Sequence, residues 1–161
     1  MKKLFGLMIA LVLAIGLLAG CGQKAPSSSE PESKPDKIEH SFDFEGLKAD
    51  VTVDISGDWD CDFGAGSVYL YNEPYTESSE AVSHGFILSR EEYDEQVDSL
   101  KQYSSWDEVG AGFIGVDEDG DARYLFYVGG EEGSEVYFMI TADSSVDAND
   151  VFGRYLVSLP E

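Results

Sequence analysis

Hydrophobic and polar residues divide this chain into three stretches of different character. After Lys2 and Lys3, residues 4–18 form an unbroken run of apolar side chains and glycine. Residues 22–40 are polar and rich in proline and serine, with Ala25 and Ile38 as their apolar side chains. From residue 41 onward, apolar side chains recur at the spacing of strands and helices, so the pattern predicts a single folded domain at residues 41–161.

Alternating apolar and polar side chains predict several strands in this domain. Val51, Val53 and Ile55 alternate with polar residues, which is the period of two of a half-buried strand. Further strands are predicted at residues 67–71, 85–88, 112–116, 123–128 and 135–141. Asp119-Gly120 and the glycine-rich segment 129–133 separate the last three, so we expect those strands to form an antiparallel meander.

Two segments carry the pattern of a helix. Ser89 and Glu92 have the spacing of a capping box, and Tyr93, Val97 and Leu100 follow at helical intervals. They predict a helix from about residue 90 to residue 103. A second helix is predicted after the capping residue Asp147; it would bury Phe152, Leu156 and Leu159 and end at Pro160.

The meander strands are apolar on both faces, because Val136, Phe138 and Ile140 alternate with Tyr137 and Met139. A sheet that is apolar on both faces has to be covered on both. We therefore predict an α+β domain in which helices cover both faces of an antiparallel sheet. Together with Trp59 after the first strand and Ile114-Gly115 before the meander, this order of elements resembles the Mog1/PsbP-like fold, which implies a non-enzymatic accessory or binding role.

The apolar run that follows Lys2 and Lys3 is typical of a signal peptide. Its 15 residues are fewer than the roughly 20 that a transmembrane helix needs to span a bilayer. It ends in Leu18-Ala19-Gly20-Cys21, which resembles the lipobox of bacterial lipoproteins. The resemblance implies a lipid on the Cys21 sulfur, cleavage between Gly20 and Cys21, and residues 1–20 as the signal peptide. Residues 21–40 would then be the lipidated cysteine and a disordered tether. The alternative is an ordinary signal peptide followed by a chance cysteine.

The charge of the domain narrows its partners. Residues 41–161 carry five basic and 28 acidic side chains, a formal charge of −23. This excludes nucleic acid, whose binding needs basic side chains, and favours cationic partners or metal ions. The alternative is that the acidity keeps an exported protein soluble.

One acidic segment has the beginning of a calcium-binding loop. Asp58, Asp60 and Asp62 stand at alternate positions, as in the D-x-D-x-D start of such a loop. The rest of the pattern is missing, since Phe63 and Tyr69 stand where glycine and glutamate are required. Ca²⁺ is therefore a candidate ligand, and a solvated acidic loop is the alternative. A second cluster, Asp117, Asp119 and Asp121 around Gly120, is interpreted as a hairpin turn.

Signals of catalysis are weak in this chain. Residues 110–115 match G-x-G-x-x-G but lead into a predicted hairpin, whereas a dinucleotide-binding motif opens a helix. The two histidines, His40 and His84, are not accompanied by the G-x-S-x-G motif of a serine hydrolase. We expect no enzymatic activity.

These patterns predict a lipoprotein that is anchored by fatty-acyl chains such as palmitate to the extracytoplasmic face of the cell membrane. A Gram-positive cell surface is favoured. It would act as a binding or accessory module without a required cofactor. Its partners would be the membrane, through the anchor, and an unidentified protein or small ligand. Two alternatives remain: calcium-dependent adhesion or sensing through Asp58, Asp60 and Asp62, and a hydrolase that uses carboxylates or His84.

Overall fold

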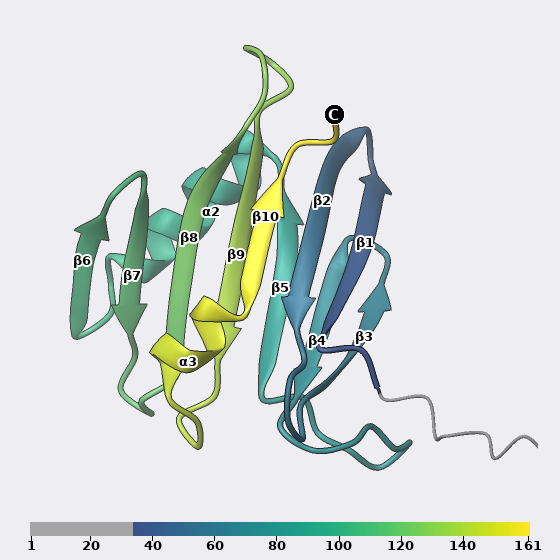
Figure 1. Cartoon of the computed structure of the whole chain (residues 1–161). Coiled ribbons are helices and arrows are strands. Elements are labelled where there is room, and N and C mark those ends of the chain that lie inside the picture. The colour runs from purple at the N-terminus through teal and green to yellow at the C-terminus, as the bar shows by residue number, and fades with distance from the viewer. Residues whose placement is uncertain (1–33) are drawn as a thin grey trace, which may run out of the picture. The chain divides into compact units, whose positions relative to one another are not determined.

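The computed structural model describes residues 34–161. The predicted signal peptide and lipobox, with Gly20 and Cys21, lie outside the described residues. In chain order the elements are β1 (Lys37–Phe44), β2 (Leu47–Asp54), β3 (Asp60–Gly64), β4 (Ser67–Tyr71), β5 (Ser83–Leu88), α2 (Arg90–Leu100), β6 (Ser105–Val109), β7 (Gly112–Val116), β8 (Ala122–Gly129), β9 (Val136–Ala142), α3 (Ala148–Gly153) and β10 (Tyr155–Ser158) (Figure 1).

The strands form two antiparallel sheets. The small sheet has the order β1-β2-β10, and the large, seven-stranded sheet has the order β3-β4-β5-β9-β8-β7-β6. The small sheet packs on one face of the large sheet, where β2 contacts β5 and β9, and α2 packs on the opposite face (Figure 1). Within the described part of the chain, no helix is long and apolar enough to cross a bilayer.

Each face of the large sheet has its own hydrophobic core, and β9 contributes to both. Val136, Phe138 and Ile140 belong to the core between the two sheets, and Tyr137 and Met139 belong to the core beneath α2. Adjacent residues of a strand point to opposite faces, so the period of two in this segment divides its side chains between the two cores. Both faces of β9 are therefore covered.

The predicted first helix is present and begins as its sequence indicates. The backbone N–H of Glu92 donates to Ser89 Oγ (3.4 Å), and the backbone N–H of Ser89 donates to Glu92 Oε2 (2.8 Å), which completes a capping box. Tyr93, Val97 and Leu100 are buried against the sheet. The helix ends at Leu100, three residues before the predicted end.

The prediction of a second helix that covers the sheet is wrong. The predicted α+β architecture, with its suspected Mog1/PsbP-like fold, is therefore wrong as well. Strands make up 48% and helices 13% of the described residues, and a sheet rather than a helix covers the second face. The helix α3 has six residues and is followed at once by β10. Tyr155 and Val157 alternate with Leu156 and Ser158, so that this segment completes the small sheet through its inward-facing side chains.

Three further strands occupy segments in which no strand was predicted. β1 begins at Lys37, within the stretch whose composition resembles a tether, and pairs with β2 over its whole length. β3 occupies the predicted calcium loop, and the polar segment 105–109 forms the edge strand β6. All three are edge strands, which pair with a neighbour on one side only and carry charged side chains.

Candidate functional site

The aspartates of the predicted calcium loop lie at the start of an edge strand. Asp58 precedes β3, and Asp60 and Asp62 lie on one face of it. The Asp60 carboxylate accepts hydrogen bonds from the backbone N–H groups of Cys61 and Tyr75, both at 3.0 Å. Asp62 accepts one from the backbone N–H of Phe63 at 2.8 Å. Across residues 34–161, no three His, Cys, Asp or Glu side chains are arranged to hold a metal ion. The Ca²⁺ site stays a prediction from sequence.

The second acidic cluster forms the turn between β7 and β8, as predicted. Asp117 Oδ1 accepts hydrogen bonds from the backbone N–H groups of Asp119 and Asp121, both at 3.0 Å, and Gly120 has a φ of 90°. The glycine motif likewise lies in the β6–β7 hairpin, where Gly110 has a φ of 59°. Both glycines allow tight turns, since positive φ strains other residues.

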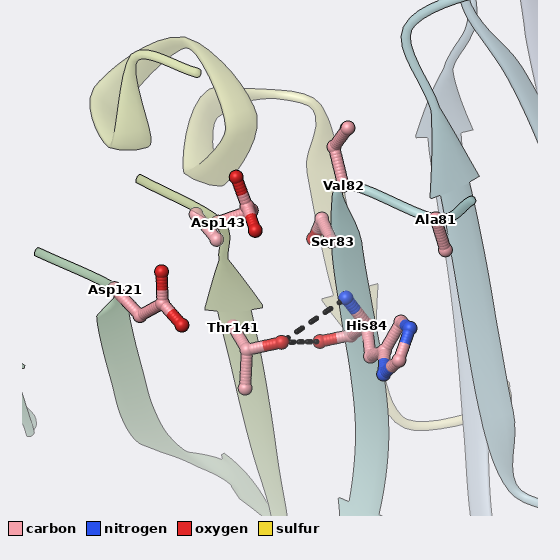
Figure 2. Close-up of a pocket in the computed structure, with 8 residues that line it drawn as sticks. Ala81, Val82, Ser83, His84, Asp121, Thr141 and Asp143 are labelled. Carbon is pink, nitrogen blue, oxygen red and sulfur yellow. Dashed lines mark hydrogen bonds between the residues drawn. The ribbon is translucent and has the colours of Figure 1, made fainter. Parts of the chain in front are cut away.

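A shallow depression of about 170 Å³ surrounds His84 at the end of the large sheet that is nearer α3 (Figure 2). Its acidic lining consists of Asp121 and Asp143. Thr141 Oγ1 accepts a hydrogen bond from the His84 backbone N–H at 3.2 Å and lies between the histidine and Asp121 (Figure 2). The depression therefore holds the residue types of an acid–base site without a contact between them.

The His84 imidazole packs among aromatic rings. Its centroid lies 5.1 Å from that of Tyr69 and 5.9 Å from that of Phe86, both in edge-to-face geometry. Burial lowers the pKa of His84, because an apolar environment disfavours the charged imidazolium. His84 is thus held neutral at pH 7.

The neighbouring Ser83 faces the other side of the sheet, where its Oγ lies 2.9 Å from the Tyr155 hydroxyl. Adjacent residues of a strand point to opposite faces, so Ser83 and His84 cannot form a nucleophile–base pair. Burial also raises the pKa of Tyr155, and its phenol stays protonated. The hydrogen bond fixes β10 to β5 through the core and is structural.

A larger feature is an apolar surface on β6, β7 and β8, which we call the open face. Pairing places Ile114 opposite Tyr124, Gly112 opposite Phe126, and Val109 opposite Gly112, so these residues share one face. It is the face that packs against the small sheet elsewhere, because Tyr124, Phe126 and Val128 border the inter-sheet core. The open face consists of Val109, Ile114, Val116, Tyr124, Phe126 and Val128.

The small sheet ends before it reaches these strands. β10 is its last strand and contacts β8, whereas β7 and β6 extend beyond it (Figure 1). Exposure rises accordingly toward the edge of the large sheet, where Val116 is 37% and Val109 46% exposed. Phe152 of α3 approaches the open face from above, with its ring 5.7 Å from that of Tyr124. The open face is an apolar sheet surface without a full cover in the described chain.

The fold and this surface together define a two-sheet β-sandwich whose smaller sheet covers part of the larger one. A comparison of the chain with models of known protein families, with curated proteins and with solved structures finds no match. The candidate site therefore rests on its geometry.

The sequence analysis placed the β7 and β8 residues of the open face in strands, but it predicted no strand at β6 and did not indicate the exposure of this face. Ile114, Tyr124 and Phe126 have the apolar pattern of covered strands, and we expected a helix above them. The signal that could have revealed the site was the alternation of Tyr155 and Val157 with Leu156 and Ser158, which is typical of a strand rather than a helix.

Proposed function

We propose that this protein is a lipid-anchored, extracytoplasmic binding module that works without catalysis and docks a partner on its open face. The N-terminal sequence supports the anchor, through the lipobox ending at Cys21. The strong acidity supports a location at the cell surface and a partner that carries positive charge.

The single observation that carries the docking role is the partly covered apolar face of β6, β7 and β8, on which Val109 and Val116 are exposed. Monomeric soluble proteins rarely expose large contiguous apolar patches, and such patches mark interaction sites. This one includes the aromatic residues Tyr124 and Phe126, a residue type enriched in protein interfaces. On the same face of these three strands, the one charged side chain is Asp107.

The geometry around His84 favours binding over catalysis. His84 is neutral and surrounded by aromatic rings, its neighbour Ser83 faces the opposite side, and Thr141 separates it from Asp121. General acid–base catalysis needs a proton donor or acceptor within hydrogen-bond reach of the reacting group and of its orienting partner. We therefore assign the function to the open face.

Site-specific photo-crosslinking in the producing cell tests the docking role. A photoreactive phenylalanine analogue replaces Ile114 on the open face or, as a control, Thr52 on the outer face of the small sheet. We expect a discrete protein adduct from position 114 that is absent from position 52. Equal labelling at both positions, or none at either, would show that the open face is not a docking surface.

The anchor is tested separately by Cys21→Ser. This variant removes the sulfur that would carry the lipid, so metabolic palmitate labelling should be lost and unprocessed precursor should accumulate. The matched control is Cys61→Ser, which changes the thiol in β3 and should leave labelling intact. Labelling that survives in Cys21→Ser would contradict the anchor.

A further inference from the structure

The four edge strands of the two sheets differ in charge. Charged side chains on an edge strand prevent other chains from pairing with it. Three edges carry them: β1 has Lys37, Glu39 and Asp43, β3 has Asp60 and Asp62, and β6 has Asp107 and Glu108. The fourth edge, β10, has the sequence Tyr-Leu-Val-Ser and carries no charge. β10 is the one edge of the described sandwich without a charged side chain.

The backbone of β10 has hydrogen-bonding groups that point away from its own sheet. The Asp54 N–H donates to the Arg154 carbonyl at 2.8 Å, which makes these two residues a hydrogen-bonded pair. Alternate residues of an antiparallel strand bond to the same neighbour, so Leu156 also faces β2. Tyr155 and Val157 then direct their N–H and C=O groups to the open edge.

The pairing on the other side of β2 agrees with this assignment. The Ile55 N–H donates to the Asp36 carbonyl at 2.7 Å, so the odd-numbered residues of β2 bond toward β1. The backbone groups of the even-numbered residues of β2, such as Thr52, therefore point toward β10. The outward direction of the Tyr155 and Val157 backbone groups is therefore fixed from two independent hydrogen bonds.

A strand added to this edge would meet the open face. Neighbouring strands lie about 4.8 Å apart and stacked sheets about 10 Å apart. β10 already contacts β8, so the next strand of the small sheet would lie over β8 and β7. Its inward side chains would cover Phe126 and Ile114, next to Phe152, which already lies against Tyr124. Its outward side chains would face solvent beside Leu156, which is 68% exposed.

We propose that β10 accepts a β-strand from a partner protein, and that this strand alternates apolar with basic side chains. The apolar side chains would cover the open face, and the basic ones would match a chain of net charge −22. A second copy of this chain fits less well, because two copies of the same charge repel each other. The inference rests on the proposed docking function and specifies its mode.

A synthetic peptide with four Val-Lys repeats, capped at both ends, is a probe of this mode. Its binding is measured by fluorescence anisotropy to the full-length protein in phosphatidylcholine vesicles, whose zwitterionic surface does not attract the peptide. We expect saturable binding to the wild type, and binding at least about tenfold weaker for a Val-Glu peptide of the same length. No saturable binding, or equal binding of both peptides, would overturn the proposal.

Two variants at one position separate the backbone from the side chain. Val157→Pro removes the backbone N–H that points to the open edge. Val157→Ala shortens the side chain but keeps this N–H. We expect Val157→Pro to weaken binding at least about tenfold and Val157→Ala by less than about threefold. Equal binding by the two variants would exclude strand addition. If the photo-crosslinked adduct at position 114 still forms in the cell, the proposed docking on the open face stands, but without strand addition at β10.

Charge changes at Leu156 give a second test in case Val157→Pro does not fold. Leu156 is exposed, so Leu156→Lys and Leu156→Glu should both fold. The lysine should weaken binding of the Val-Lys peptide, and the glutamate should strengthen it. Identical affinities of the two variants for the peptide would contradict the proposal. A wild-type protein that sediments as a dimer without peptide, and a Leu156→Lys variant that sediments as a monomer, would also contradict it, because the β10 edge would then serve self-association.

Discussion

The two halves of one face of the large sheet have similar apolar strands but different covers. Where the small sheet lies above it, Leu70 and Phe138 are 0% and Ile140 is 1% exposed. On the other half, Val116 and Val109 are 37% and 46% exposed. The difference lies in the extent of the small sheet, which ends at β10. The same apolar pattern is thus buried in one half and partly exposed in the other.

This comparison predicts a large difference in stability between equivalent truncations. Phe138→Ala removes a fully buried ring from the inter-sheet core and should lower the free energy of unfolding by about 3–5 kcal/mol. Ile114→Ala removes a partly buried side chain and should cost less, about 1–2 kcal/mol. Urea unfolding measures both. Equal losses would show that the open face is part of the core and contradict the division into two halves.

A smaller effect is expected from adding a single carbon atom in each environment. In Gly85→Ala the new Cβ would lie 2.9 Å from the Phe138 ring and 3.0 Å from the Tyr155 ring, so we expect a loss of about 1–3 kcal/mol. In Gly153→Ala, at the end of α3, nothing lies within 4 Å of the new Cβ. There we expect a gain of about 0.5 kcal/mol. Thermal unfolding that ranks the two variants in the reverse order would contradict the tight packing under the small sheet.

The smallest expected effect is a change in how the stability depends on pH, and it concerns His84 on the opposite face of the large sheet. Because burial lowers the pKa of His84 below its unfolded value of 6.5, the unfolded chain binds the proton more tightly. This contribution to stability is present above about pH 6.5 and is lost as the pH falls below it. His84→Gln should therefore lose less melting temperature than the wild type between pH 7.5 and pH 5.5. An unchanged pH dependence would mean that His84 is not desolvated.

Local signals in the sequence were sufficient for the elements that form by themselves. The capping box at Ser89 and the turn at Asp119-Gly120 specify backbone geometry within a few residues, and both are found. The alternation in β9 correctly indicated that both faces are covered. Such patterns record that a side chain is buried, but they do not record what buries it.

The missing parts depend on pairing between distant segments. β10 pairs with β2 across about a hundred residues of chain, and the polar strands β1, β3 and β6 are held by a neighbour on one side. The candidate site was missed for the same reason. Whether Ile114 and Val116 are covered depends on where the small sheet ends, and this is a property of the tertiary structure.

The central claim is that a partner completes the sandwich at β10 and over the open face. Amide hydrogen exchange of the full-length protein, with and without the Val-Lys peptide, tests it most directly. We predict slower exchange in segments 155–158 and 122–129 when the peptide is bound, and unchanged exchange in segment 37–44 at the opposite edge of the small sheet. Slower exchange at 37–44, or no change at 155–158, would contradict the account.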